Sequence, residues 1–243
     1  MYAVVESKTN GVKKIVVLTG AGISAESGIN TFRDANGLWE GHDIMDVASP
    51  DGFRRNPALV LDFYNKRRKQ LLGVEPNLAH RALAGLQDLF EVSVITQNVD
   101  DLHERAGSRH VIHLHGELLK ARSTFDEDLV YDWKKDINIG DFCEHHHQLR
   151  PHIVWFGETV PRIEYAAQAV SEADIIMIIG TSMQVYPAAG LVNYAPENTP
   201  VYFIDPKPGI SENSRPHLTI IPEKATTGVP RAIAMILDNR RQR

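Results

Sequence analysis

Cysteine is nearly absent from this sequence, which has a single one, Cys143, in 243 residues. An intramolecular disulfide is therefore excluded, and such scarcity is typical of proteins from a reducing compartment. Long apolar runs are missing as well, since none approaches the roughly 18 residues that a membrane-spanning helix needs. Residues 1–10 also lack the apolar stretch of a secretion signal. We therefore expect a cytoplasmic protein that does not associate with membranes.

A strong excess of charge of either sign is also lacking. The chain has 26 Lys and Arg residues against 31 Asp and Glu residues, for a net charge of −5. This balance gives no electrostatic case for sequence-independent binding of nucleic acid, so no nucleic-acid partner is expected. The length allows one large domain, or a main domain with a small insert. It leaves the oligomeric state open, a monomer included.

Short apolar runs alternate with helical patterns along the chain. Most of the runs are continuous, as expected for strands covered on both faces. The alternation predicts an α/β fold with a doubly wound parallel sheet, in which ligands bind beyond the carboxyl ends of the strands. Strands are expected at Ile15–Thr19, Val92–Thr96, Val111–Leu114, Ile153–Phe156, Asp174–Ile179, Val201–Ile204 and Leu218–Ile221. Helices are expected at Pro57–Leu72, Asn77–Phe90, Asp100–Ala106, Arg162–Glu172, Ala188–Tyr194 and Val229–Asp238.

Two stretches do not follow the alternation. Residues 30–56 are rich in Gly, Asp, Asn and Pro, a composition that favours a mobile loop covering the ligand site. Residues 117–150 are charged and weakly periodic, which favours a small excursion from the main fold. We therefore expect one domain over 1–243, with the segments at about 30–72 and 117–150 forming a small inserted module.

A glycine-rich turn follows the first predicted strand. Gly20-x-Gly22-x-x-Ala25 fits the dinucleotide fingerprint, in which glycines let backbone N–H groups approach a pyrophosphate. The alternative is a tight strand-to-helix turn with no ligand. The acidic residue that the standard fingerprint has about 20 positions later is missing, because Asp43 and Asp46 lie in a loop-like stretch. This departure argues against a hydride-transferring dehydrogenase.

Polar residues follow the other predicted strands too. Asn98 and Asp100 come after Val92–Thr96, where they could hold ribose hydroxyls or a carboxamide, or simply cap the next helix. His113 and His115 share one face of the following strand. A histidine before a glycine at a strand's end can act as a general base, although a lone histidine is more often structural.

Two later strands end in the same kind of residue. Gly180-Thr181-Ser182 follows the strand at Asp174–Ile179, and this turn could take a phosphate or a ribose. Asp205 follows Val201–Ile204, where it could bind a ribose hydroxyl or start a turn. Chance explains one such strand end easily and four of them poorly.

Taken together, these motifs resemble those of the sirtuin family. They are Gly20-Ala-Gly-Ile-Ser24 with Ser27-Gly28-Ile29 and Phe32-Arg33, Gln97-Asn98-x-Asp100, Leu114-His115-Gly116, Arg150-Pro151-His152-Ile-Val-Trp-Phe-Gly-Glu158 and Gly180-Thr-Ser-x-x-Val185. Sirtuins are NAD-dependent protein-lysine deacylases on a Rossmann-like domain with a small inserted module. The resemblance therefore implies this fold, NAD as cofactor, and acylated-lysine proteins or peptides as partners.

The resemblance also implies a role for each motif. His115 is the general base that activates a ribose hydroxyl, Asn98 orients the ribose, and Asp100 holds the nicotinamide carboxamide. The acyl oxygen of the substrate lysine attacks C1′ of the ribose, nicotinamide leaves, and the products are free lysine and O-acyl-ADP-ribose. The implied catalytic residues are His115 and Asn98. The implied cofactor-binding residues are Gly20, Ala21, Gly22, Arg33, Gln97, Asn98, Asp100, Gly180, Thr181, Ser182, Asp205 and Ala225.

The substrate-binding residues carried over from the family are Tyr64, Arg67, Val154, Phe156, Gly157 and Val185. The last four belong to two edges that clamp an extended peptide through main-chain hydrogen bonds. Tyr64 and Arg67 are three apart on a predicted helix and share a face. They resemble the Tyr-x-x-Arg signature of the branch that removes succinyl and malonyl groups and retains some deacetylase activity. The alternative is that Arg67 belongs to a solvated cluster of basic residues.

The chain departs from most sirtuins in lacking the four cysteines that bind a structural zinc. Cys143 near His145, His146 and His147 does not have the ligand spacing that zinc normally needs, so no metal is expected. We expect apolar packing to hold the insert instead, around Phe125, Leu129, Tyr131 and Trp133.

Two other functions stay open on the sequence. A protein ADP-ribosyltransferase would use the same NAD site and transfer ADP-ribose to protein. A non-catalytic sensor would bind NAD or ADP-ribose without releasing nicotinamide, although the presence of His115, Asn98 and Asp100 argues against it.

Overall fold

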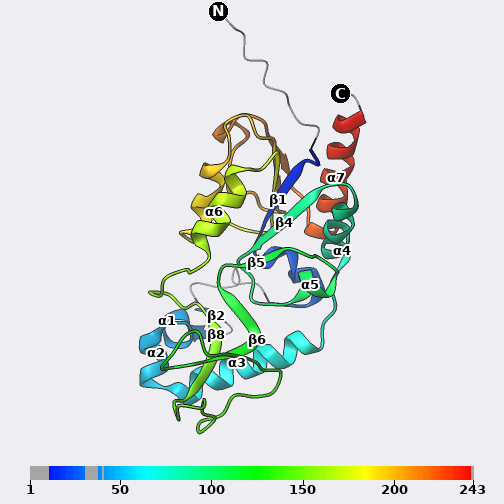
Figure 1. Cartoon of the computed structure of the whole chain (residues 1–243). Helices are drawn as coiled ribbons and strands as arrows, with labels where there is room; N and C mark the ends of the chain where they lie inside the picture. Colours follow the sequence, from blue (N-terminus) through cyan, green and yellow to red (C-terminus); the bar gives the residue numbers. More distant parts are fainter. Residues whose placement is uncertain (1–10, 31–37, 40, 242–243) are drawn as a thin grey trace, which may run out of the picture.

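A six-stranded parallel sheet forms the centre of the protein, in a computed structural model that describes residues 11–30, 38–39 and 41–241 (Figure 1). The strand order is β11-β10-β9-β1-β4-β5. The strands are β1 (Lys14–Thr19), β4 (Glu91–Thr96), β5 (Val111–His113), β9 (Ile175–Ile179), β10 (Val201–Ile204) and β11 (Leu218–Ile221). The chain adds β4 and β5 on one side of β1, then adds β9, β10 and β11 on the other. The predicted doubly wound, Rossmann-like sheet is confirmed, and its switch point lies between β1 and β9.

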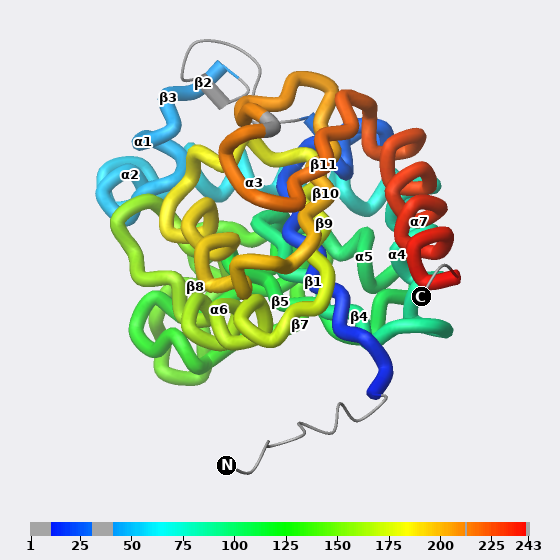
Figure 2. The backbone as a smooth tube through the Cα atoms, turned by 90° about the horizontal axis from the view of Figure 1, so that it is seen from above, coloured from blue at the N-terminus to red at the C-terminus, as the bar shows by residue number. Residues whose placement is uncertain are grey.

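Helices cover both faces of this sheet, as Figure 2 shows from above. One face packs on α4 (Leu78–Gly85) and α7 (Ala225–Arg241), the other on α6 (Ile163–Ser171) and the 3-10 helix at Ala188–Tyr194. Successive residues of a strand point to opposite faces. Ile15 and Val17 therefore enter one core, while Val16 and Leu18 enter the other. This arrangement explains why the strand sequences are continuously apolar.

A smaller lobe lies beyond the carboxyl edge of the large sheet (Figure 1). It contains α1 (Ile44–Val47), α2 (Pro50–Arg55) and α3 (Pro57–Leu72), with a short pair of strands, β2 (Leu38–Trp39) and β3 (His42–Asp43). Its antiparallel sheet has the order β7-β6-β8, from β6 (Gly116–Ser123), β7 (Val130–Asp132) and β8 (Leu149–Ile153). Helix α3 begins at its predicted residue because Pro57 suits the first turn and the Asn56 side chain accepts from the Leu59 N–H.

Several predicted elements differ from the observed ones. Residues 153–156 are not a strand of the parallel sheet, because β8 ends at Ile153 and pairs only with β6. The run is apolar because Ile153 and Trp155 pack on the core of the smaller lobe. The first glycine turn leads into two 3-10 turns, Ala21–Ile23 and Ala25–Ser27, and not into an α-helix. The 188–194 helix is of the 3-10 kind, and α7 begins four residues earlier than expected.

The remaining short elements are α5 (Leu102–Arg105) and the 3-10 turns at Leu86–Asp88 and Glu212–Ser214. In the part of the chain described here, no helix is long and apolar enough to cross a membrane.

Candidate functional site

One cavity at the switch point collects most of the residues that the sequence singled out. Its volume is about 290 Å³, and it is lined by the segments that follow β1, β4, β5, β8 and β9 together with helix α3. The expected residues that line it are Gly20, Ala21, Gly22, Tyr64, Arg67, Gln97, Asn98, Asp100, His115, Val154, Phe156, Gly157, Gly180, Thr181, Ser182 and Val185.

The glycines bring the end of β1 against the end of β9. The N–H of Gly20 donates to the Ile179 carbonyl at 3.0 Å, and that of Gly22 donates to the Gly180 carbonyl at 2.8 Å. A Cβ on Gly22 would lie 2.6 Å from the Gly180 Cα, which leaves no room for a side chain. Gly180 has φ +61°, a conformation that favours glycine. These glycines therefore join two loops at the switch point, and the N–H groups of Gly20 and Gly22 are engaged within the protein.

Ser24 links the two polar side chains that follow β4. Its hydroxyl donates to Asp100 Oδ2 at 2.9 Å and accepts from the Asn98 amide at 3.2 Å. The Asn98 amide also donates to the Gly20 carbonyl at 3.2 Å. Asp100 also accepts from the N–H of Leu102, the first residue of α5, at 3.2 Å. It therefore stabilises the start of that helix and lines the cavity as well. Burial raises the pKa of Asp100 to about 6.

His115 lies two residues after the end of β5 and lines the same cavity. Its Nδ1 lies 3.0 Å from the Gln97 carbonyl oxygen, which can only accept a hydrogen bond. The neutral ring must therefore carry its proton on Nδ1 and keep a lone pair on Nε2. Burial lowers the pKa of His115 more than the Gln97 carbonyl raises it, so the imidazole is neutral near pH 7. This is the protonation state that a general base needs.

Two expected cofactor residues do not line the cavity, and a third, Arg33, falls outside the described residues. Asp205 is buried and its Oδ1 accepts from the Lys207 N–H at 2.8 Å, which is the turn-starting alternative. Ala225 is buried at the start of α7. Neither of these two lines the cavity, whereas Gln97 does, donating to the Thr181 hydroxyl at 3.1 Å.

Tyr64 and Arg67 share the face of α3 that lines the cavity. Arg67 is 7% exposed and Tyr64 is 0% exposed, whereas Lys66 and Lys69 beside them are exposed. The alternative interpretation of a solvated basic cluster is therefore wrong for Arg67. Its guanidinium carbon lies 5.6 Å from the centre of the Phe63 ring.

Trp155 connects Tyr64 to a buried set of charges. The indole Nε1 donates to the Tyr64 hydroxyl at 3.0 Å, and the Arg150 guanidinium lies 3.2 Å from the centre of the indole ring. Burial raises the pKa of Tyr64, so its hydroxyl keeps a proton and can itself donate.

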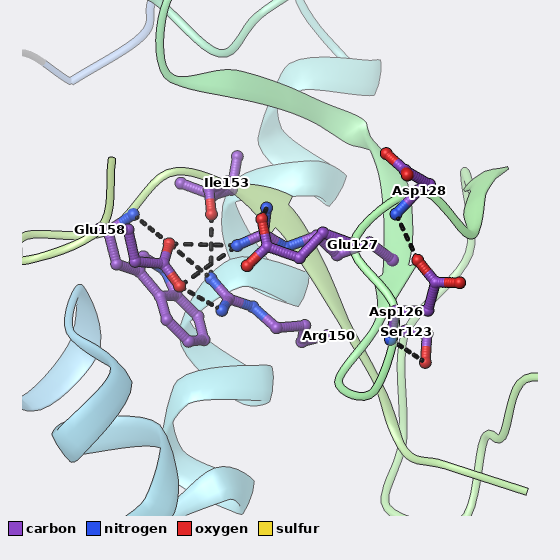
Figure 3. A network of polar contacts seen from close by, with 9 residues as sticks. Ser123, Asp126, Glu127, Asp128, Arg150, Ile153 and Glu158 are labelled. Atoms are coloured by element: carbon purple, nitrogen blue, oxygen red, sulfur yellow. Dashed lines mark hydrogen bonds and ion pairs between the residues drawn. The ribbon is translucent and has the colours of Figure 1, made fainter. Parts of the chain in front are cut away.

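Glu158 holds this set of charges together (Figure 3). Its carboxylate accepts from Arg150 Nη1 at 2.6 Å, from Arg122 Nη2 at 3.1 Å and from the Trp155 N–H at 2.8 Å. Figure 3 shows the Ile153 carbonyl beside the pair, where Arg150 Nη2 donates to it at 2.9 Å. The opposite charges lower the pKa of Glu158 against the effect of burial. The network fixes the segment that carries Trp155 onto the wall of the cavity.

Apolar packing fills the inside of the smaller sheet. The buried members of this cluster are Leu61, Ala121, Ile137, Cys143 and Leu149, with Leu129, Tyr131 and Trp133 packed against them. Phe125 was expected here, but it is 64% exposed and stacks on the His147 ring at 4.4 Å. Cys143 accepts from the Ser123 hydroxyl at 3.3 Å. No group of three or more His, Cys, Asp or Glu side chains among the described residues could hold a metal ion.

Comparison with known families and proteins gives a consistent picture. The sequence model of the Sir2 family matches residues 20–187 of this chain. An NAD-dependent protein deacylase of Helicobacter pylori strain 26695 is 61% identical over 196 residues, which cover 81% of this chain and 86% of that protein. An NAD-dependent protein deacylase of Bacteroides thetaiotaomicron is 54% identical over 224 residues, covering 90% of this chain and 95% of the relative.

Solved structures agree with the sequence relatives. A complex of a Sir2 homologue with NAD has a TM-score of 0.80 at 36% identity, over 94% of this chain and 91% of that one. A complex of Sir2 with a p53 peptide and NAD+ has a TM-score of 0.76 at 30% identity, over 93% of this chain and 94% of that one.

Proposed function

This chain belongs to the Sir2 family, and from that premise we propose that it is an NAD-dependent protein-lysine deacylase that prefers succinyl and malonyl groups to acetyl groups. The products of the proposed reaction are free lysine, nicotinamide and O-acyl-ADP-ribose. The observation that carries the acyl preference is the buried pair Tyr64 and Arg67, which lines the same cavity as His115.

The residues on the cavity wall fit NAD. Asn98 and Asp100 offer an amide and a carboxylate fixed by Ser24, which suit the hydroxyls of a ribose and the N–H groups of a carboxamide. The turn at Gly180–Ser182 adds backbone and hydroxyl groups at the switch point, where doubly wound proteins bind nucleotides. NAD supplies the ribose carbon that the acyl oxygen attacks and the nicotinamide that leaves.

His115 is the general base in this proposal. Its neutral ring has a lone pair on Nε2, which takes a proton from a ribose hydroxyl and so makes that oxygen a nucleophile. Asn98 orients the ribose through its amide, which contacts with Gly20 and Ser24 hold in place. The lowered pKa of His115 predicts that this step works down to pH values below the ordinary histidine range.

The acylated protein binds as an extended peptide between two edges, one at Val154–Gly157 and one at Val185. The N–H groups of Val154 and Phe156 already donate to the carbonyls of His115 and Ala48, both at 2.9 Å. The peptide's main-chain bonds on this edge therefore fall to the carbonyl groups of the segment and to Gly157, whose φ of +92° turns the chain.

At the far end of the acyl group, Arg67 and Tyr64 bind the terminal carboxylate. An arginine can donate two parallel hydrogen bonds to a carboxylate, and a protonated tyrosine can donate a third. An acetyl group is too short to reach this pair and has no charge to offer it. Because the pair is buried, its attraction for the carboxylate is weakly screened by water.

The test uses one peptide carrying succinyl-, malonyl- or acetyl-lysine, with and without NAD, followed by mass spectrometry. We expect NAD-dependent loss of all three groups, with kcat/KM higher for succinyl and malonyl than for acetyl. Faster loss of acetyl would refute the acyl preference and keep the deacylase. Loss of none of them, with ADP-ribose transferred to protein or NAD merely bound, would refute the deacylase itself.

Arg67→Met supplies the variant and Lys66→Met its matched control. Lys66 lies next to Arg67 on α3, is 72% exposed and pairs with Asp62 on the surface, so its loss leaves the cavity unchanged. Arg67→Met should lower kcat/KM for the succinyl peptide by at least about 100-fold, because two charge-assisted hydrogen bonds at roughly 1.5–3 kcal/mol each are lost. The same variant should leave the acetyl peptide within about threefold of wild type.

A further inference from the structure

Two histidines form hydrogen bonds with consecutive backbone carbonyl groups of the turn that follows β4. His113 and His115 point to the same face because they are two residues apart at the end of β5. His115 Nδ1 lies 3.0 Å from the Gln97 oxygen, and His113 Nδ1 lies 3.1 Å from the Asn98 oxygen. Only His115 lines the cavity, so His113 acts from behind the wall, on the residue that orients the ribose.

The second nitrogen of His113 is occupied as well. Its Nε2 lies 2.7 Å from Oε1 of Glu104, on helix α5, and the imidazole is 9% exposed. Both partners of the ring, a carbonyl oxygen and a carboxylate oxygen, can only accept hydrogen bonds. Both ring nitrogens must therefore donate, and the ring that fits this geometry is the charged imidazolium. His115, two residues later, is held in the neutral form, so the two histidines have opposite protonation states.

The surrounding charges support the charged state of His113. Burial alone would lower its pKa, but the hydrogen bond and charge of Glu104, the Asn98 carbonyl and the more distant Glu117 on β6 together raise the pKa above the ordinary value. The other titratable groups nearby are Asp100 on the turn and His103 on α5. Burial lowers the pKa of His103, which packs against the His80 ring at 4.9 Å and stays neutral.

We propose that His113, held in its charged form by Glu104, is a positioning residue that fixes the Asn98 carbonyl and so aims the Asn98 amide at the ribose of NAD. Asn98 is then held at three points. Its backbone N–H donates to the Thr96 hydroxyl at 3.0 Å, its side-chain amide donates to the Gly20 carbonyl and the Ser24 hydroxyl, and its backbone carbonyl accepts from His113. Loss of the third point frees the peptide plane next to the catalytic histidine. This inference rests on the proposed function.

The charge of His113 makes the positioning dependent on pH. The pKa of His113 is raised in the folded protein, so both hydrogen bonds are complete at low pH. As the pH rises through that raised pKa, the neutral ring keeps a single N–H, which donates to the charged Glu104 carboxylate in preference to the Asn98 carbonyl, and the contact with Asn98 is lost. His115 behaves in the opposite sense, because it must lose its proton to act. kcat/KM for NAD should therefore rise through the lowered pKa of His115 and fall through the raised pKa of His113.

Three substitutions separate the parts of this device. His113→Leu removes both hydrogen bonds, His113→Asn keeps a neutral donor near the Nδ1 position, and Glu104→Gln keeps an acceptor without the charge. His110→Asn is the matched control, since His110 precedes β5 and its side chain contacts the Ser93 and Tyr165 hydroxyls, away from Asn98. The readouts are the dissociation constant for NAD by calorimetry, KM and kcat across pH, and thermal unfolding as a check on folding.

We expect His113→Leu to weaken NAD binding and raise KM for NAD about tenfold, the effect of losing one charge-assisted hydrogen bond, with a smaller change in kcat. His113→Asn should recover most of the affinity and lose the alkaline fall in kcat/KM. Glu104→Gln should move that fall to lower pH, and His110→Asn should match wild type in all readouts.

The inference is overturned if the alkaline fall stays in place in Glu104→Gln and His113→Asn, or if His113→Leu binds NAD as wild type does. Glu104→Gln and His113→Asn both keep a polar side chain, so they test the inference even if His113→Leu fails to fold. A wild-type protein that neither binds NAD nor deacylates would overturn the proposed function itself, and this inference with it.

Discussion

Replacing Glu158 with Gln should destabilise the protein far more than a surface substitution would. The Glu158 side chain is 16% exposed and pairs with Arg150 and Arg122, whose side chains are 9% and 5% exposed. Glutamine keeps the size but removes the negative charge, which leaves two buried guanidinium groups close together without a carboxylate between them. Breaking a buried ion pair by removing one partner costs about 3–5 kcal/mol.

Glu127, a second partner of Arg122, supplies the control. Arg122 also pairs with Glu127 at 3.5 Å, but Glu127 is 72% exposed, so Glu127→Gln should cost only about 0–1 kcal/mol. Urea titrations would give the free energy of unfolding, and thermal scans should show Glu158→Gln lower by roughly 6–20 °C. Equal costs for Glu127→Gln and Glu158→Gln would refute the argument from burial.

The pH dependence of this difference follows from the pKa of Glu158. That pKa is lowered in the folded protein, so the stabilisation is complete above the unfolded value near 4.5 and is lost as the pH falls through the lowered folded value. A difference between wild type and Glu158→Gln that stayed constant down to strongly acidic pH would contradict the assignment of the charge to the folded state.

Three further predictions test other parts of the site. The free energy of unfolding of wild type relative to Asp100→Asn should fall by about 2 kcal/mol between pH 4 and pH 7, because folded Asp100 keeps its proton to about pH 6 while the unfolded chain releases it near 3.8; a flat difference in urea titrations would disprove this. A chelator should leave both the unfolding temperature and the deacylase rate unchanged, and a drop in either would reveal a metal. Trp155→Phe removes the donor to the Tyr64 hydroxyl, so it should lower kcat/KM for a succinyl peptide about tenfold while sparing an acetyl peptide, and equal losses would contradict the role of Tyr64 in reading the acyl group.

Most of the large sheet could be predicted from local sequence. Ile15–Leu18 is continuously apolar because its side chains enter two cores at once, and this pattern is visible in the sequence alone. Pro57 and Asn56 mark the start of α3 by their own backbone preferences. Ile153–Phe156 misled because apolar runs look alike whether they lie in a strand or pack as a loop, and only the pairing of β8 with β6 distinguishes the two.

The cavity residues were predictable to the extent that they follow strands. Asn98, His115 and Gly180 each lie within two residues of the end of a strand, and the carboxyl ends of parallel strands meet at a shared edge. Asp205 also follows a strand, but its strand lies two positions away from β1 in the sheet, and the carboxylate turns toward the Lys207 N–H. The position of a strand within the sheet is a tertiary fact that local sequence does not contain.

Three residues of the site were missed as site residues although they lie inside the motifs that were found. Ser24 belongs to the first glycine-rich motif, and Trp155 and Glu158 close the motif that begins at Arg150. Their importance comes from contacts with partners distant in sequence: Ser24 with Asp100, Trp155 with Tyr64, and Glu158 with Arg122. The spacing of Arg150 and Glu158 could have suggested an ion pair between them, but nothing in the local sequence indicates that Arg122 is the second partner of Glu158.

In the proposed function, the buried Arg67 distinguishes acyl groups by their charge. The most direct measurement compares kcat/KM for a succinyl-lysine peptide with that for its neutral amide isostere, in wild type and in Arg67→Met. We expect a strong preference for the charged peptide in wild type and a ratio near one in Arg67→Met. An unchanged ratio in Arg67→Met would contradict it.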